Sequence, residues 1–162
     1  MPDIPLAGLM PPALHRAVLR VGERARRVWW RLRKPQLRGC ALVPLGADGA
    51  VLLVRHSYRA RGEWQLVTGG VDSGETHEEA ARRELDEEVG LTARALIQVL
   101  RERVEMHGAM NDVIVFAARV EGAPHIDNRE IAEARFFAAD ALPDAMSEWA
   151  RHYVEAALRH CD

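Results

Sequence analysis

After a proline-rich start, apolar residues recur at every third or fourth position from residue 14 to residue 32. The apolar positions are Leu14, Val18, Val21, Ala25, Val28 and Leu32. This spacing matches the period of an α-helix and predicts an amphipathic helix with one apolar stripe. Its polar face carries Arg16, Arg20, Arg24, Arg27 and Arg31. We expect the stripe to pack on the rest of the chain or on a second copy in a homodimer. Binding of the arginines to nucleic acid or to a membrane surface is the alternative.

After this segment the helical period gives way to short runs of apolar and β-branched residues. Two such runs, at 37–45 and 50–57, flank the turn-forming segment 46–49 (Gly-Ala-Asp-Gly), which is typical of a β-hairpin. A further short strand is predicted at 64–67. The glycine-containing segment 68–75 that follows is predicted to be a tight loop, because glycine tolerates backbone conformations closed to other residues.

A second helix is predicted at 76–89, where both ends carry helix signals. Thr76, followed three residues later by Glu79, forms a capping-box pattern, and Gly90 is a natural stop. Oppositely charged residues four positions apart would add to its stability: Glu78 with Arg82, and Glu79 with Arg83.

The rest of the chain contains more strands and a last helix. Strands are predicted at 95–105, 111–120 and 133–138. A terminal helix is predicted at 145–160, with Trp149, Tyr153 and Leu158 facing inward. Because strands and helices do not alternate strictly, the expected fold class is α+β, an α/β/α sandwich with a mixed β-sheet.

Length and composition fit one compact domain with its own core. We therefore expect the basic amphipathic helix at 1–35 to precede a single domain at 36–162. The two cysteines, Cys40 and Cys161, suit neither a disulfide framework nor a zinc site. No apolar run approaches the roughly 20 residues of a membrane-spanning helix, and the N-terminus lacks the pattern of a signal peptide. A cytoplasmic protein is the expectation.

Charge is unevenly distributed, although its formal total is only −2. Residues 1–38 contain nine Arg and Lys but only two acids, Asp3 and Glu23, so the remaining body is acidic. An acidic body would repel a polyphosphate unless bound cations intervened. Phosphate chemistry in this body would therefore require a bound metal ion.

Three glutamates of the second predicted helix share one of its faces. On a helical wheel Glu84, Glu87 and Glu88 fall within an arc of roughly 100°, beside the apolar Leu85 and Val89. Such acids repel one another, and a hard divalent cation such as Mg²⁺ or Mn²⁺ would relieve that repulsion. The alternative is a solvated helix face, which acids at this spacing more often form.

The residues around these acids follow a longer pattern. The specified positions are Gly69, Glu75, Arg83-Glu84-Leu85, Glu87-Glu88 and Gly90-Leu91. This pattern resembles the Nudix box at every specified position, and the family's fold would cover about residues 36–160. One departure is Val67-Thr68, where many relatives have Pro-Gly. Since the ligand expected there is a backbone carbonyl, we expect changed metal affinity or selectivity rather than loss of activity.

The resemblance implies a metal site and a reaction. The ligands of Mg²⁺ or Mn²⁺ would be Glu84, Glu87, Glu88 and a backbone carbonyl, that of Gly69 or of the neighbouring Thr68. Glu75 and Arg83 would brace the helix. A metal-activated water would attack one phosphorus of a diphosphate in a nucleotide-like substrate.

The catalytic residues implied by the resemblance are two box acids and a loop acid: Glu84, Glu88 and Glu130. The base that accepts the proton of the water is either Glu84 or a loop acid, Glu130 or Glu133, with Glu130 favoured by its position. A basic residue at the end of the second strand, Arg55 or His56, would meet a phosphate. Successive strand residues point to opposite faces, so at most one of this pair enters the site.

The sequence after the box lacks the marks of the family's best-defined subgroups. ADP-ribose enzymes have a proline in this region and dinucleoside polyphosphate enzymes a tyrosine, whereas residues 106–109 are Met-His-Gly-Ala. A nucleoside triphosphate or another small nucleoside diphosphate derivative is the expected substrate. Tyr58, Trp64 and Phe137 are candidates for stacking on its base. The alternatives are a nucleotide-sensing regulatory module on the same fold, and a hydrolase that the basic arm directs to an RNA end or a lipid headgroup.

Overall fold

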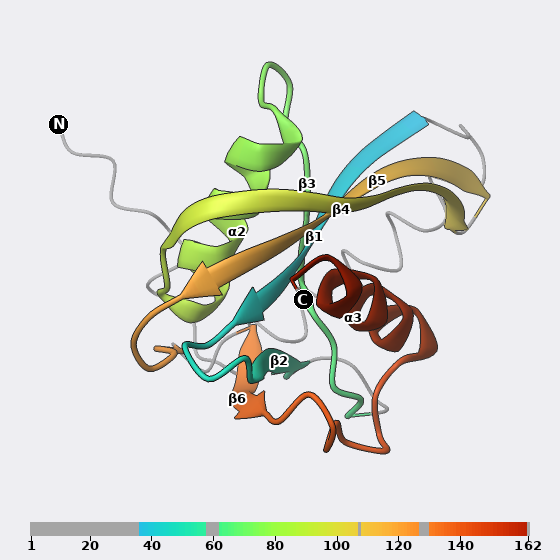
Figure 1. The fold of residues 1–162 in the computed structure, drawn as a ribbon. Coiled ribbons are helices and arrows are strands. Elements are labelled where there is room, and N and C mark those ends of the chain that lie inside the picture. Colours follow the sequence, from blue (N-terminus) through green and yellow to red (C-terminus); the bar gives the residue numbers. More distant parts are fainter. Residues whose placement is uncertain (1–35, 58–61, 107, 127–129, 162) are drawn as a thin grey trace, which may run out of the picture.

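The computed structural model describes residues 36–57, 62–106, 108–126 and 130–161. The helix predicted at 1–35 lies outside the described residues. The elements, drawn in Figure 1, are β1 (Gln36–Leu45), β2 (Val51–His56), β3 (Val67–Gly70), α2 (His77–Val89), β4 (Ala93–Met106), β5 (Ala109–Val120), β6 (Ile131–Phe137) and α3 (Glu148–Cys161). None of the helices in these ranges is long and apolar enough to cross a membrane.

Six strands form one mixed sheet in the order β4-β5-β1-β2-β6, with β3 attached to β1 outside this path. β1 and β5 run parallel, with Cys40 opposite Ile114, and the other neighbouring strands are antiparallel. β1 changes partner along its length, because residues 39–42 pair with β3 whereas Leu45 meets Val51 of β2. The outer edge of β3 consequently has no strand beside it among the described residues.

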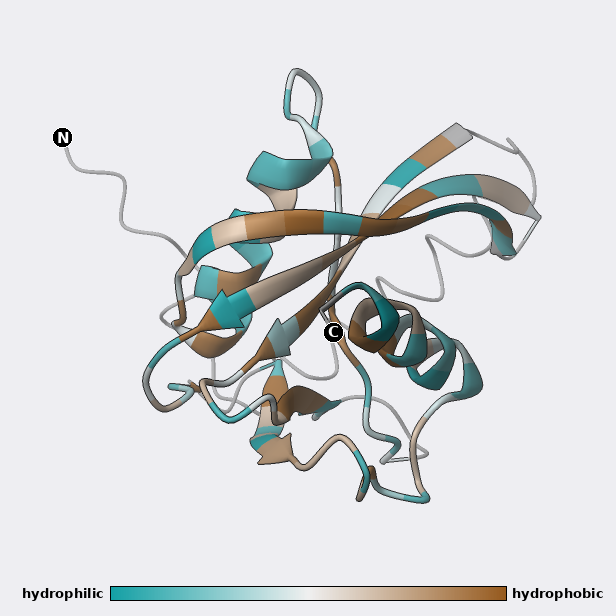
Figure 2. Cartoon of the chain, in the orientation of Figure 1, coloured by the Kyte–Doolittle hydropathy of each residue, from teal (hydrophilic) through white to brown (hydrophobic). Residues whose placement is uncertain are grey.

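The two helices cover opposite faces of the sheet, which confirms the α/β/α sandwich (Figure 1). Because side chains alternate along a strand, Cys40 and Leu42 of β1 pack toward α2, whereas Ala41 and Val43 pack toward α3. Figure 2 shows the central strands mostly brown and the outer sides of both helices teal. Each face of the sheet therefore has its own apolar core.

The predicted turn between the first two strands is confirmed, but the hairpin is short. The Gly46 N–H donates to the carbonyl of Ala50 at 2.8 Å, and Gly49 has a left-handed φ of 80°. Beyond Leu45 and Val51 the two strands separate, and β2 pairs along its length with β6. That pairing joins segments far apart in the sequence, which no local pattern predicts.

The third strand is displaced from its predicted position. β3 covers Val67–Gly70 rather than 64–67, because the first residues expected in a glycine loop pair with β1 instead. Trp64 and Gln65 form only isolated bridges, to Met146 and Val54. The first two glycines of the predicted loop are thus held in the sheet.

The second predicted helix is confirmed as α2, together with both of its end signals. Thr76 Oγ1 accepts a hydrogen bond from the Glu79 N–H at 3.2 Å, and the Thr76 N–H donates to Glu79 Oε2 at 2.8 Å. Gly90 ends the helix at a left-handed φ of 63°, and its N–H donates to the carbonyl of Asp86.

One of the two predicted charge pairs on α2 is present and the other is wrong. Glu78 lies 2.9 Å from Arg82, as predicted. Glu79 does not pair with Arg83, because its carboxylate accepts the hydrogen bonds of the cap while Arg83 turns to Glu75. The helix start therefore uses Glu79 locally and leaves Arg83 available for the loop.

The capping box predicts a measurable stability loss. We expect Thr76→Ala to lower the free energy of unfolding by about 1 kcal/mol, because the first turn of α2 loses its side-chain acceptor. Urea denaturation followed by circular dichroism measures this loss. Thr92→Ala, at an exposed position beyond the helix, is the matched control and should change stability by less than about 0.5 kcal/mol. Equal losses in both variants would contradict the role of the cap.

Candidate active site

A cavity of about 600 Å³ lies where β1, β3, α2 and α3 approach one another. Small-molecule sites commonly have volumes of about 300 to 1,000 Å³. Its walls come from both faces of the sheet, because Cys40 and Glu84 lie on the α2 side and Ala41, Val113 and Tyr153 lie on the α3 side. The cavity therefore joins the two faces of the sheet beside β3.

The fold brings several of the predicted site residues together around this cavity. Those that line it are His56, Gly69, Glu84, Glu88 and Glu130. They come from β2, β3, α2 and the segment before β6, which are widely separated in the sequence. The predicted residues outside the lining are Arg55, Glu75, Arg83 and Glu87.

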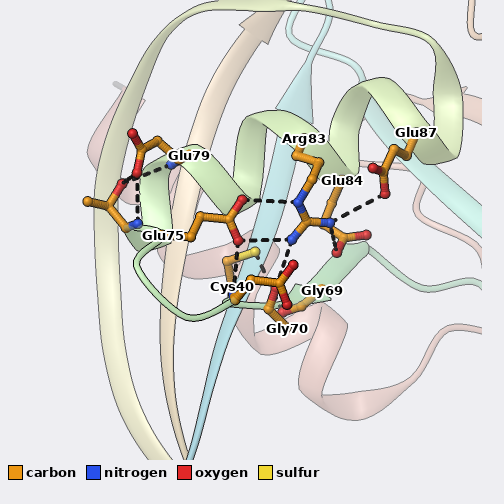
Figure 3. Close-up of polar contacts among 10 residues, drawn as sticks. Cys40, Gly69, Gly70, Glu75, Glu79, Arg83, Glu84 and Glu87 are labelled. Carbon is orange, nitrogen blue, oxygen red and sulfur yellow. Dashed lines mark hydrogen bonds and ion pairs between the residues drawn. The ribbon is translucent and has the colours of Figure 1, made fainter.

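Glu84 lies directly against the backbone of Gly69 (Figure 3). A Cβ atom at position 69 would stand 2.0 Å from both Cδ and Oε1 of Glu84, which is far inside van der Waals contact. The constraint is one of space rather than of backbone conformation, since Gly69 does not have a positive φ. Glycine at this position therefore lets the carboxylate of α2 touch the main chain of β3.

The guanidinium of Arg83 joins three parts of the site (Figure 3). It makes two contacts of 3.0 Å with the carboxylate of Glu75, in the loop before α2, and one of 2.7 Å with Glu84 Oε1. It also donates to the carbonyl of Gly70 at 3.0 Å and lies 3.3 Å from Glu87 Oε2. Bidentate arginine–carboxylate contacts are among the stronger hydrogen bonds, so Arg83 fixes the start of α2 to the end of β3.

Glu75 and Glu84 both contact Arg83, but their pKa values are shifted in opposite directions. Hydrogen bonds from Arg83, and then from the Asp72 backbone, hold the pKa of Glu75 below its ordinary value. Burial raises the pKa of Glu84 in spite of the same arginine, and the Glu84 side chain is only 15% exposed. Arg83 therefore compensates the buried charge of Glu84 only in part.

The residues that line the cavity include the oxygen ligands that a hard cation prefers. These are the carboxylates of Glu84 and Glu88 and the main chain of Gly69. Across the part of the chain that the structure describes, no three His, Cys, Asp or Glu side chains converge closely enough to hold a metal ion. Glu87 is 59% exposed and lies beside Arg83. The donor set thus fits Mg²⁺ or Mn²⁺ in chemical type, while Arg83 contacts Glu84 and Glu87, two of the three predicted carboxylate ligands.

Arg55 and His56, at the end of β2, point to different surroundings, as strand alternation predicts. His56 is buried and lines the cavity. Arg55 turns away from it, with its guanidinium 2.8 Å from Glu133 of β6 and 4.5 Å from the ring centroid of Trp64. Of this pair, His56 is the residue in position to meet a molecule in the cavity.

Of the two loop acids, Glu130 lines the cavity and Glu133 does not. Glu133 lies within β6, where it pairs with Arg55 and, at 3.2 Å, with Arg135. Glu130 precedes β6 and lines the cavity, and its backbone carbonyl accepts a hydrogen bond from the Ser57 N–H at 2.8 Å. This bond ties the Glu130 segment to the end of β2.

Several residues of the cavity lie outside the site predicted from the sequence: Arg38, Asn111, Trp149 and Tyr153. The helical pattern correctly turns Trp149 and Tyr153 inward but does not reveal that they meet a cavity. Asn111 carries one signal, because it is polar at a β5 position in phase with the buried Val113 and Val115. Arg38 carries none, since it belongs to an arginine-rich segment.

Two of the three aromatic residues predicted to stack on a base have other neighbours. Trp64 and Phe137 pack on each other with ring centroids 4.9 Å apart, and Trp64 belongs to the apolar core on the α3 side. Tyr58 lies outside the described residues. The structure therefore gives Trp64 and Phe137 a packing role and places other rings, those of α3, at the cavity.

Cys40 lies beside Gly69 on the neighbouring strand. Its thiol donates to the carbonyl of Gly69 at 3.6 Å, and burial raises the pKa of the thiol to about 12. A thiol with so high a pKa remains protonated at neutral pH and is a poor nucleophile. Cys40 therefore contributes packing and a weak hydrogen bond rather than chemistry.

The contact between Glu84 and Gly69 predicts different effects at two adjacent glycines. We expect Gly69→Ala to lower the free energy of unfolding by about 1 to 3 kcal/mol, because Glu84 has to leave its position. Gly70→Ala is the matched control, since a Cβ there would meet nothing within 4 Å. The two losses are measured by urea denaturation.

Combining Gly69→Ala with Glu84→Ala removes the obstructing carboxylate. The double variant should recover most of the loss in a double-mutant cycle. Additive losses, or equal losses at positions 69 and 70, would contradict the steric account.

Comparisons with known proteins agree with this geometry. The NUDIX domain model matches residues 35–157. The NAD-capped RNA hydrolase NudC of Escherichia coli O1:K1 is 31% identical over 110 residues, which is 67% of this chain and 42% of NudC. The chain thus spans less than half the length of that relative.

Solved structures show the same fold. The MutT NUDIX hydrolase from Burkholderia pseudomallei superposes with a TM-score of 0.67 at 25% identity, covering 75% of this chain and 98% of that one. The MutT protein from Methanosarcina mazei Go1 superposes with a TM-score of 0.68 at 23% identity, covering 80% and 98%. Since the domain model covers most of the chain, including α2 and all the described strands, the chain belongs to the Nudix hydrolase family.

Proposed function

We propose that this protein is a divalent-metal-dependent pyrophosphohydrolase that cleaves a diphosphate bond in a nucleotide-like substrate. The observation that carries the proposal is the contact of Glu84 with Gly69 inside a cavity that Glu88 and Glu130 also line. Burial raises the pKa of Glu84 even beside Arg83, so the anionic carboxylate is compensated only in part. The acids of this cavity therefore gain from binding Mg²⁺ or Mn²⁺ together with a phosphate chain.

In this proposal the metal ligands are Glu84, Glu87, Glu88 and the Gly69 carbonyl. The metal, when bound, polarises a phosphoryl oxygen and lowers the pKa of a water molecule. Arg83 orients Glu84 and offsets the repulsion among the acids. Glu87 is exposed and held only at 3.3 Å by Arg83, so a small rotation of its side chain would make it available.

The remaining steps belong to residues that line the cavity. Glu130 accepts a proton from the attacking water, with Glu84 as the alternative base. The oxygen of that water forms a bond to one phosphorus, and the bridging phosphorus–oxygen bond breaks with its electron pair leaving on the departing phosphate. His56 and Arg38 bind phosphate oxygens, whereas Arg55 is engaged by Glu133 and Trp64.

A nucleoside triphosphate or another small nucleoside diphosphate derivative is the substrate we propose, acted on in the cytoplasm. Because NudC is an NAD-capped RNA hydrolase, a capped RNA end is the second candidate, and the basic segment at 1–35 would assist its binding. A purely regulatory, nucleotide-sensing role is disfavoured, because every acid of the box is present.

Metal-dependent hydrolysis is tested by release of phosphate and nucleotide. A panel of nucleoside triphosphates, ADP-ribose, dinucleoside polyphosphates, NADH and capped RNA is assayed with Mg²⁺, Mn²⁺ or EDTA. We expect Glu84→Gln and Glu87→Gln each to lower kcat/KM by about 100-fold or more, since metal stabilisation of the transition state amounts to several kcal/mol. Asp86→Asn, at an exposed position of the same helix, should retain activity. Equal turnover in wild type and Glu87→Gln would refute the assignment.

The raised pKa of Glu84 also predicts an effect on stability. The folded-state pKa lies above the ordinary value of about 4.3, so stability falls as pH rises through the ordinary pKa and then the folded pKa. At any pH above the folded-state pKa the metal-free protein carries this penalty in full. We expect Glu84→Gln to raise Tm in EDTA, and Mg²⁺ to raise Tm in wild type but not in the variant. A lower Tm of Glu84→Gln in EDTA, or the same Mg²⁺ response in both, would contradict this.

A further inference from the structure

Asn111 presents a buried amide to the α3 side of the cavity. The residue is 9% exposed, and its Oδ1 has no hydrogen-bond partner among the described residues. Buried polar side chains ordinarily have partners. A buried, unpaired acceptor oxygen on a residue that lines a cavity indicates a binding position for a hydrogen-bond donor of a ligand, which the side chain meets by a small rotation.

The strand register explains how the amide reaches this wall. Asn111 is in phase with Val113 on β5, on the α3 face of the sheet. A Cβ at Gly39 of β1 would lie 3.0 Å from Asn111 Nδ2 and 3.1 Å from Oδ1, so glycine leaves space for the amide on this face. The amide therefore lies over a glycine, as the Glu84 carboxylate lies over Gly69.

These two glycines are close neighbours in the sheet. Gly39 pairs with Gly70, and the next residue of β1, Cys40, pairs with Gly69. Neighbouring strands lie about 4.8 Å apart, and successive side chains point to opposite faces. Asn111 and Glu84 are thus on opposite faces of nearly the same point of the sheet, within one cavity that joins those faces. A molecule bound by its phosphates at Glu84 would place its attached group near Asn111.

The walls around Asn111 suit a planar, mostly apolar group. Trp149 and Tyr153 of α3 line this side, with ring centroids 5.6 Å apart, together with Val104 and Val113. Burial raises the pKa of Tyr153 to about 12, so its phenol is uncharged at neutral pH. Aromatic walls with one amide can stack on a ring and hydrogen-bond its edge.

We propose that the α3 side of the cavity binds the nucleobase of the substrate and that Asn111 selects a 6-aminopurine. The exocyclic amine of adenine donates to Oδ1, and the adjacent N7 accepts from Nδ2, the pairing that asparagine makes with adenine elsewhere. The Hoogsteen edge of guanine offers two acceptors and no donor for Oδ1. This selection rests on the proposed function only for the orientation of the phosphates.

Equilibrium binding separates base selection from catalysis. We compare AMP with purine riboside 5′-monophosphate, which lacks the amine, by isothermal titration calorimetry on wild-type protein, Asn111→Leu and Gln98→Leu. Wild type should bind AMP about 10-fold or more tightly than the analogue. Asn111→Leu should bind both equally, and Gln98→Leu, at an exposed position of β4, should behave as wild type.

The comparison of the two ligands on wild type requires no variant to fold. Equal affinity for AMP and the analogue, or no binding of AMP, would overturn the proposal. The same preference should appear in kcat/KM for ATP over GTP, and Asn111→Leu should abolish it. Selective AMP binding in a protein that hydrolyses no tested nucleotide would support the base site and count against the proposed function. Hydrolysis of ATP and GTP with equal kcat/KM would support the proposed function and count against the base site.

Discussion

The helix α2 lies so close to β3 that the carboxylate of Glu84 rests on the main chain of Gly69, in a place that a side chain at position 69 would fill. In the same place Arg83 reaches both Glu75 and the Gly70 carbonyl. The capping box then fixes the first turn without using Arg83. The capping box at the start of α2 and the absence of a side chain at Gly69 thus together place the partly compensated carboxylate of Glu84 at the cavity. Phosphate chemistry at this site would depend on that negative charge, because it favours binding of a divalent cation.

Sequence patterns predicted those parts of the fold that neighbouring residues determine. The start and end of α2 follow from Thr76, Glu79 and Gly90, whose interactions span only a few residues. The partner of β2 did not follow, because its pairing with β6 depends on chain segments brought together by the whole fold. The boundaries of β3 failed for a related reason: glycines that look like a loop are held by hydrogen bonds to β1.

The candidate site was likewise predictable only where its residues lie in one short segment of the sequence. The box acids were predictable because they occupy one continuous segment with a recognisable pattern, although the pattern did not show that Arg83 contacts Glu87 while Glu84 enters the cavity. Strand alternation correctly separated Arg55 from His56, but only the fold shows that Glu133 engages Arg55. The α3 side of the cavity combines residues from β5 and the last helix. No short motif contains them, and Asn111 differed from its surroundings only by being polar at an apolar position.

The two close-approach glycines have a consequence for how this cavity can diverge. A side chain at position 39 would press on the amide at 111, which would have to shift, and a side chain at position 69 would overlap the carboxylate at 84, which would have to leave its position. The two pairs lie on opposite faces, so each can change without disturbing the other. Among homologous chains, residues 39 and 111 should therefore covary as a unit, independently of 69 and 84. Ligand preference on one face could drift in evolution while the acidic face on the other stays unchanged.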